Sequence, residues 1–306
     1  MLKLEELATE KINPATRHID TMTTLEMVTV INSEDARVAP AVGRELPAIA
    51  KAIDIITERL KEDGRLFYAG AGTSGRLGVL DASECPPTFG TEPELVQGLI
   101  AGGKEAMFVA QEGAEDDRQL AADDLTAAGL TARDVVVSLA ASGRTPYSIG
   151  AIRYARLTGA YSIAIVCSPD SPMSREAELT ICPLPGPEVI TGSTRLKAGT
   201  AQKLVLNMLS TGVMIKLGKV YGNLMVDVQA TNKKLAERSR RIVMEATGCS
   251  REEAEAALSR TEGQAKLAVF LLLSGLDVQT ARQRLAAADG YVARALRNCT
   301  EACLHS

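Results

Sequence analysis

The chain has 306 residues and a formal net charge of −4; 46% of its residues are hydrophobic and 24% are charged, as in ordinary globular proteins with a sizeable core. The lack of a basic block argues against a nucleic-acid partner, and the lack of an apolar run of about 18 residues argues against a membrane span. The six cysteines follow no disulfide or zinc spacing and the only histidines are His18 and His305, so we expect no metal site and no histidine-based catalytic triad.

The first 43 residues combine turn signals with short helical pieces such as 24–28. Acidic residues interrupt this end of the chain, which lacks the apolar core of a secretion signal, so we expect a cytoplasmic protein. Apolar residues at helical spacing then predict an amphipathic helix over 45–60. We expect residues 1–43 to pack on the core as an N-terminal segment.

Short, almost wholly apolar runs alternate with helical segments in the next part of the chain. Such runs are typical of parallel strands buried on both faces. Strands that alternate with helices favour a parallel sheet covered by helices on both sides. The sequence therefore predicts an α/β fold of three layers, helix–sheet–helix, around a central parallel sheet. The predicted strands are 66–69, 95–100, 135–140, 162–167 and 179–183, and one intervening helix covers 146–157.

Two loops rich in glycine and hydroxyl groups each follow one of these strands and lead into a helix: 70–76 (GAGTSGR) and 140–147 (AASGRTPY). Glycine allows a positive φ and a close approach of the backbone to a ligand. Ser and Thr add hydroxyl donors, and the free N–H groups at a helix start favour an anion. Because open parallel sheets bind ligands at the carboxyl ends of their strands, the pair predicts a site for a phosphorylated small molecule. Tight turns that need small residues are the alternative explanation.

Residues 70–75 also match the dinucleotide fingerprint G-x-G-x-x-G. That fingerprint requires an acidic residue about 20 positions later, at the end of the next strand. Here the next strand closes with 100–103 (IAGG), and Glu92 and Glu94 precede it. We therefore do not expect NAD. A P-loop is excluded as well, because no Gly-Lys-Ser/Thr follows.

A third polar cluster, 191–197 (TGSTRLK), starts a long helical segment. Its hydroxyl groups and two cations suit a phosphate or a carboxylate, so Ser193, Arg195 and Lys197 are candidate binding residues. The segment that follows, 203–214, is apolar on nearly all sides. That pattern indicates a helix buried in the core or at a subunit interface.

Two glutamates are candidate acid/base groups. Glu84 lies in 81–88 (DASECPPT), where we expect the double proline to stop the helix that begins at the first loop. Glu115 lies in 112–117 (EGAEDD), after the second predicted strand. Shielding from water or a neighbouring carboxylate would raise the pKa of either group toward the range useful for proton transfer. Solvated acids at helix ends are the alternative explanation.

The C-terminal part of the chain, 236–306, is Ala-rich and helical with no strand signal. It contains a weak duplication in which each copy predicts a helix, a glycine-containing turn and a second helix. We expect a small all-helical, UBA-like appendage, and coincidence between Ala-rich helices is the alternative. The matching pairs, 27 residues apart, are Ala254 and Ala281, Leu258 and Leu285, Glu262 and Asp289, Gly263 and Gly290, Ala265 and Val292, and Ala268 and Ala295.

Taken together, these motifs resemble a known family. The repeated pattern of strand, Ser/Thr/Gly loop and helix is similar to the sugar isomerase (SIS) fold. Within that fold the chain resembles the N-acetylmuramic acid 6-phosphate etherases over nearly its whole length. The resemblance implies an SIS-type sandwich over 44–235. The matching stretches are 70–87, 99–103, 112–116, 140–147, 191–210, 221–232 and 247–249.

The resemblance implies cleavage of the lactyl ether at C3 of N-acetylmuramic acid 6-phosphate to N-acetylglucosamine 6-phosphate and D-lactate, in cell-wall amino-sugar recycling. It implies elimination of lactate followed by addition of water, with no metal and no redox cofactor. Glu84 matches the family's proton donor and Glu115 its second active-site acid. Which of the two removes the C2 proton stays open.

The resemblance also implies a homodimer and a set of substrate-binding residues. Ser193, Arg195 and Lys197 are candidates for the lactyl carboxylate or the phosphate. The residues expected to line the phosphate and sugar site are Thr73, Ser74, Ser142, Gly143, Arg144 and Thr145.

Two other functions share these features. An aldose–ketose isomerase on the same fold would use similar loops and a glutamate base, but would leave the lactyl group unexplained. A sensor that binds a sugar phosphate and regulates a partner enzyme would be expected to have extra domains or to lack the catalytic acids. The sequence shows neither sign, so the etherase remains the favoured function.

Overall fold

The computed structural model describes residues 10–228 and 233–304, and these form two compact units. The sheet unit contains the chain up to Ser83 together with Pro93–Ser210. The helical unit contains Glu84–Glu92 and the chain from Thr211 onward. Asn232, which ends one of the matching stretches, lies outside the described residues.

The sheet unit is built on a sheet of five described strands, all parallel, in the order β2-β1-β3-β4-β5. β1 and β3 are buried along their whole length, as the unbroken apolar runs predict. All five predicted strands are present. They are β1 (Leu66–Gly70), β2 (Val96–Ile100), β3 (Val135–Leu139), β4 (Tyr161–Ile165) and β5 (Leu179–Ile181).

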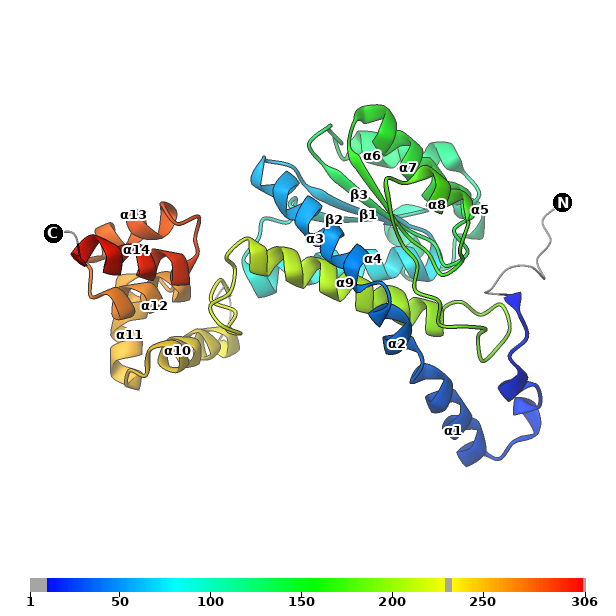
Figure 1. Ribbon diagram of the computed structural model, residues 1–306, viewed down its shortest axis with the longest axis horizontal. Helices are drawn as coiled ribbons and strands as arrows, with labels where there is room; N and C mark the ends of the chain where they lie inside the picture. Colours follow the sequence, from blue (N-terminus) through cyan, green and yellow to red (C-terminus); the bar gives the residue numbers. More distant parts are fainter. Residues whose placement is uncertain (1–9, 229–232, 305–306) are drawn as a thin grey trace. The chain divides into compact units, whose positions relative to one another are not determined.

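Helices cover both faces of this sheet, which gives the three layers expected (Figure 1). On one face Phe67 and Val136 pack with α6 (Arg118–Ala127) and α7 (Pro146–Thr158). On the other face Tyr68 contacts α4 (Gly72–Phe89), and α4 in turn contacts α9 (Lys197–Lys216). The remaining helical elements of the unit are η3 (Pro14–Thr16), η4 (Ile19–Thr21), α1 (Thr24–Asp35), α2 (Val38–Gly43), α3 (Leu46–Lys61), η5 (Gly103–Met107), α5 (Glu112–Glu115) and α8 (Pro172–Glu176).

The double proline does not stop α4, contrary to expectation. The helix continues through Pro86 and Pro87 to Phe89. Proline removes a backbone donor, but its fixed φ is itself compatible with a helix, and here both prolines lie in the last turn. The backbone N–H of Gly90 donates to the carbonyl of Pro86 at 2.9 Å, and Gly90 then leaves the helix at φ +60°. The chain is therefore turned by the glycine rather than by the prolines.

The helical unit confirms the predicted duplication. In the first copy Glu262 and Gly263 both have positive φ, at +55° and +80°. In the second copy Asp289 and Gly290 have nearly the same values, +54° and +75°. The alanines and the valine of the repeat are buried in one core. The helices are α10 (Lys233–Thr247), α11 (Arg251–Arg260), α12 (Ala265–Ser274), α13 (Val278–Ala286) and α14 (Val292–Leu304).

None of the helices within 10–228 and 233–304 combines the length and the apolar character that crossing a bilayer requires.

Candidate functional site

The two glycine- and hydroxyl-rich loops lie next to each other. β1 and β3 are neighbours in the sheet, and their last residues, Gly70 and Leu139, are paired in register. β2 lies on the far side of β1, so the chain reverses its direction of travel across the sheet between β1 and β3. Ligands of open parallel sheets bind at such a switch point, outside the carboxyl ends of the strands. The structure thus brings the two predicted loops to one place.

The first loop turns sharply from β1 into α4. Gly72 has φ +52°, and a Cβ on Gly75 would lie 2.5 Å from the carbonyl oxygen of Gly70, so both positions need glycine. Thr73 and Ser74 occupy the first turn of α4, where backbone N–H groups lack partners within the helix. The Ser74 hydroxyl donates to Oε1 of Gln202 on α9 at 2.9 Å. The first loop therefore places a helix N-terminus and the Thr73 hydroxyl at the carboxyl end of β1, while the Ser74 hydroxyl is bonded to Gln202.

The second loop is equally tight. Gly143 has φ +64°, and a Cβ there would come within 2.2 Å of the Ser171 hydroxyl. The backbone N–H of Arg144 donates to the Ser142 hydroxyl at 3.2 Å, and Thr145 precedes α7 without capping it through its side chain. Nε of Arg144 is buried and has no hydrogen-bond partner among the described residues. A buried donor of this kind is costly unless a ligand satisfies it.

Helix α9 carries a residue that the sequence analysis did not select. Gln202 is 1% exposed and contacts Ser74 across the α4–α9 interface. One position further on, Lys203 forms an ion pair with the buried Asp81 of α4 at 3.5 Å. Asp81 also accepts a hydrogen bond from Tyr68 at 3.0 Å. Burial raises the pKa of Asp81, although the Lys203 charge and the Tyr68 hydrogen bond oppose the shift. These polar contacts fix the register of α4 against α9.

The third predicted cluster is split by the structure. The side chain of Lys197 is fully buried, and its Nζ lies 2.5 Å from Oε2 of Glu34 and 3.3 Å from the carbonyl of Pro185. Asn13 also donates to Glu34. Arg37 also pairs with Glu34, at 3.1 Å. We call Asn13, Glu34, Arg37 and Lys197 the closed cluster. The Lys197 ammonium is thus enclosed and paired with Glu34, and its binding of a substrate anion stays a prediction.

The other two residues of that cluster are more accessible. Ser193 is partly buried, and Arg195 is exposed. Arg195 lines a groove of about 560 Å³ together with apolar residues of α1 and of the chain before α9. Binding of an anion by Ser193 or Arg195 stays a prediction.

Both candidate glutamates are exposed. Glu84 lies on α4, ten residues after Ser74. Glu115 is the last residue of the short helix α5, which follows β2 and η5. An exposed carboxylate is available to a substrate without a large desolvation cost. The assembly of these two groups with the loops into one catalytic site stays a prediction.

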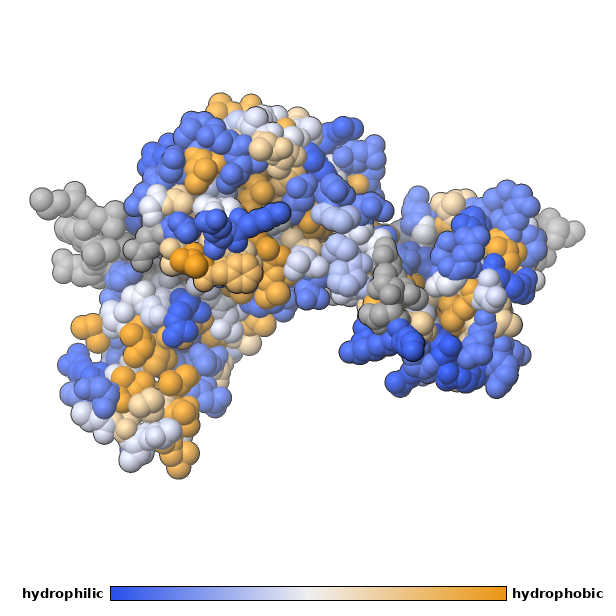
Figure 2. Space-filling view, turned by 180° about the vertical axis from the view of Figure 1, so that it is seen from behind, coloured by the Kyte–Doolittle hydropathy of each residue, from blue (hydrophilic) through white to orange (hydrophobic). Residues whose placement is uncertain are grey.

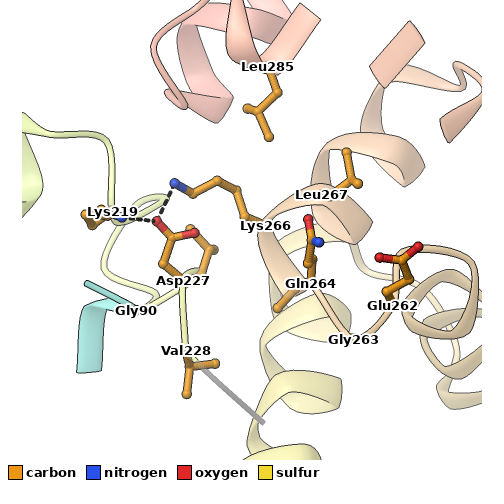
Figure 3. A pocket seen from close by; sticks show the side chains of 12 residues that line it. Gly90, Lys219, Asp227, Val228, Glu262, Gly263, Gln264, Lys266, Leu267 and Leu285 are labelled. Carbon is orange, nitrogen blue, oxygen red and sulfur yellow. Dashed lines mark hydrogen bonds and ion pairs between the residues drawn. The ribbon is translucent and has the colours of Figure 1, made fainter. Parts of the chain in front are cut away.

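A separate pocket of about 460 Å³ lies within the helical unit (Figure 3). Asp227 lies between two lysines there: its Oδ2 is 2.5 Å from Nζ of Lys266 and 3.5 Å from Nζ of Lys219. Burial lowers the pKa of Lys266, and the charge of Asp227 opposes that shift.

No group of three or more His, Cys, Asp or Glu side chains in the described parts of the chain could hold a metal ion.

Three family models match the chain. The N-terminal SIS domain of the glucokinase regulatory protein matches residues 48–156, and the general SIS domain matches 117–212. The C-terminal lid domain of the glucokinase regulatory protein matches 222–267. Among solved structures, a phosphoheptose isomerase from Neisseria gonorrhoeae is similar in fold, with a TM-score of 0.50 and 17% identity over 62% of this chain and 98% of that one.

Curated relatives are much more similar. An N-acetylmuramic acid 6-phosphate etherase of Clostridium beijerinckii is 60% identical over 97% of this chain and 97% of its own length. The etherase of Serratia proteamaculans is 60% identical over 96% of this chain and 99% of its own length. The chain therefore belongs to the N-acetylmuramic acid 6-phosphate etherase family and is built on an SIS domain.

Proposed function

We propose that this enzyme cleaves the lactyl ether of N-acetylmuramic acid 6-phosphate, giving N-acetylglucosamine 6-phosphate and D-lactate. The observation that carries the proposal is the 60% identity to etherases along nearly the whole of both chains. The two adjacent loops at the β1–β3 switch point support it, because they present hydroxyl groups and helix N-termini of the kind that hold a phosphate.

The chemistry follows from the substrate. An ether oxygen is a poor leaving group, so direct hydrolysis is slow. In the open-chain aldehyde form the C2 proton becomes removable, because the resulting negative charge is delocalised into the carbonyl. A base takes the C2 proton, the C3–O bond breaks, and lactate leaves with a proton from an acid. Water then adds to the conjugated double bond, with its hydroxyl at C3 and a proton at C2.

We assign the proton transfers to Glu84 and Glu115. Two carboxyl groups are sufficient, since one donates a proton to lactate and one removes the proton at C2. Both groups are exposed, so a substrate can reach them, and the assignment itself rests on their match to the family's motifs. We propose that Thr73, Ser74, Ser142, Gly143, Arg144 and Thr145 hold the phosphate and sugar, with Ser193 and Arg195 as further candidates for an anionic group.

The direct test is incubation with N-acetylmuramic acid 6-phosphate and an assay for free D-lactate. In heavy water the product should carry deuterium at C2, and in ¹⁸O-labelled water it should carry the label at C3. Label in the lactate hydroxyl would show attack on the other side of the ether and would contradict the elimination. Formation of a ketose from simple hexose phosphates, without lactate release, would favour an isomerase instead.

We further infer a homodimer. Leu25 and Val28 of α1 are 74% and 49% exposed, and Ile190 beside the apolar groove is 53% exposed. Figure 2 shows hydrophobic residues gathered on the surface of the α1 segment. A second copy of the chain would cover such a surface. Light scattering should give twice the chain mass, and Val28→Glu should reduce it.

Two expectations of the sequence analysis are kept as proposals. The first is the division into an N-terminal segment (1–43), a sugar-phosphate-binding domain (44–235) and a helical domain (236–306). The second is a cytoplasmic location, which suits an enzyme that acts on a phosphorylated sugar.

A further inference from the structure

The contact between Ser74 and Gln202 leaves one polar group without a partner. The Ser74 hydroxyl donates to Oε1 of Gln202 at 2.9 Å. Nε2 of the same amide is buried and makes no hydrogen bond within the described residues. Gln202 as a whole is only 1% exposed. A buried amide nitrogen with two unused protons is rare in folded proteins. Burial removes its hydrogen bonds to water, and the free energy of folding suffers unless protein groups replace them.

The position of Gln202 explains which ligand could satisfy this group. On α9, Ala198 and Gln202 are four residues apart and so lie on one face of the helix. The Ala198 carbonyl is 3.9 Å from Sγ of Cys167, just after β4, and Gly199 lies beside Thr73 of the first loop. The backbone N–H of Cys167 donates to Ala141 of the second loop at 2.8 Å. The first turn of α9 therefore contacts the loop after β1 and the segment after β4, and that segment is hydrogen-bonded to the loop after β3.

The number of protons on Ser74 and Gln202 decides which of the two side chains can donate to a bound anion. A serine hydroxyl has a single proton, and here Ser74 gives that proton to an amide oxygen, which can only accept. In this arrangement the Ser74 hydroxyl cannot donate to an anion, so Ser74 contributes to the proposed site through its backbone N–H in the first turn of α4 and by orienting Gln202. The amide nitrogen of Gln202 can donate to an anion, since both of its protons are free. The reversed amide would instead donate to Ser74 and leave its own oxygen buried without a donor.

We propose that Gln202 is a substrate-binding residue whose amide nitrogen donates to the phosphate of the sugar, and that Ser74 is the positioning residue that holds the amide in this orientation. The inference deepens the proposed function and rests on it.

Ser168 adds an independent observation at the same edge of the sheet. Its hydroxyl is buried, with the residue 3% exposed, and makes no hydrogen bond in the part of the chain that the structure describes. It follows directly on Cys167, which contacts Ala198 of α9. The segment after β4, which contacts α9 through Cys167, thus also carries a buried hydroxyl that a ligand would satisfy.

The test compares Gln202→Met with Ser74→Ala in the full-length protein. Methionine keeps the length of the side chain and removes the donor. The matched control is Gln283→Met, the same change at an exposed position of α13. Calorimetric titration with N-acetylglucosamine 6-phosphate and with unphosphorylated N-acetylglucosamine gives the dissociation constants, and steady-state kinetics give kcat and KM.

We expect Gln202→Met to weaken binding of the phosphorylated sugar by about 10- to 100-fold, the usual range for a hydrogen bond to a charged group. KM should rise, kcat should change little, and affinity for the unphosphorylated sugar should not change. Ser74→Ala should have a smaller effect, because the amide remains. The melting temperature of ligand-free Gln202→Met should not fall, since an unsatisfied buried donor is removed.

Wild-type affinity in Gln202→Met, or a drop in its ligand-free melting temperature with unchanged binding, would overturn the inference and leave Gln202 a packing residue. If Gln202→Met fails to fold, Gln202→Glu replaces it: Glu still accepts from Ser74 but offers no donor, so the same loss of binding is expected. Failure of the wild-type chain to bind the phosphorylated sugar would count against the proposed function itself, and with it this inference.

Discussion

Two buried polar side chains of α9, Lys197 and Gln202, differ in whether their hydrogen-bonding groups have partners. At the start of α9, the closed cluster around Lys197 pairs its ammonium with Glu34 and a backbone carbonyl. Five residues later, Gln202 leaves an amide nitrogen unpaired within the described chain. Both side chains are almost wholly buried. The comparison shows that Gln202 and Lys197 differ in unused hydrogen-bonding capacity, which is the property on which the proposed role of Gln202 rests.

The largest expected effect concerns a group outside the closed cluster. Glu84→Gln should lower kcat by about 10²- to 10⁴-fold, the usual contribution of a general acid or base. Because Glu84 is exposed, the thermal unfolding curve should not change. Kinetics with N-acetylmuramic acid 6-phosphate check the first part and calorimetry the second. Near wild-type turnover would remove Glu84 from the proton transfers.

For a substitution in the closed cluster we expect a loss of stability rather than a loss of turnover. Lys197→Met removes the buried cation of Glu34 and leaves only the exposed Arg37 guanidinium beside it, so the protein should be destabilised, by at most roughly 3–5 kcal/mol. The double variant with Glu34→Leu should recover most of that loss, because both charges are then absent. Urea unfolding measures both. If folded Lys197→Met binds N-acetylglucosamine 6-phosphate normally, the contrast with Gln202 holds; if stability is unchanged and binding is lost, the contrast fails.

A smaller effect is expected from the second loop. Gly143→Ala should cost roughly 1–3 kcal/mol, because the residue has φ +64° and its new Cβ would lie 2.2 Å from the Ser171 hydroxyl. Gly129→Ala is the matched control, since Gly129 has φ +68° and nothing within 4 Å of a Cβ. The difference between the two variants isolates the steric clash, and equal losses would show that φ alone matters.

The smallest effect is a pH dependence. Burial alone would raise the pKa of Glu34, but hydrogen bonds from Lys197, Asn13 and Arg37 outweigh it, so the pKa lies below its ordinary value. Its contribution to stability is therefore complete above the unfolded pKa near ~4.3 and is lost as the pH falls through the folded value. Urea unfolding of wild type and Glu34→Gln should show a stability difference that shrinks in this acidic range.

The fold was predictable because its signals are local. Each strand is a short apolar run, and each ligand loop lies directly after such a run, as in 66–76. The duplicated turns were also visible, since Glu262-Gly263 and Asp289-Gly290 each carry their own glycine. The sequence does not predict that α4 continues through Pro86, because it does not show that both prolines lie in the last turn, where a helix tolerates them.

The contacts of Lys197 and Gln202 depend on distant partners. The sequence predicts Lys197 as an anion-binding residue and does not reveal its ion-pair partner, Glu34, which is 163 residues away. It gives no sign of the contact of Gln202, because the partner, Ser74, is 128 residues away. A single sequence shows which polar residues exist, but only the folded chain shows which of them already have a partner.

The two matching turns of the helical unit allow the cost of backbone strain to be measured by substitution. Glu262 and Asp289 hold a left-handed conformation that L-residues with a Cβ adopt at a cost of about 1–2 kcal/mol. Glycine at either position would relieve that strain. It would also raise the conformational entropy of the unfolded chain, which opposes folding. Because the same motif occurs twice, one copy can be altered while the other serves as an internal reference within a single molecule.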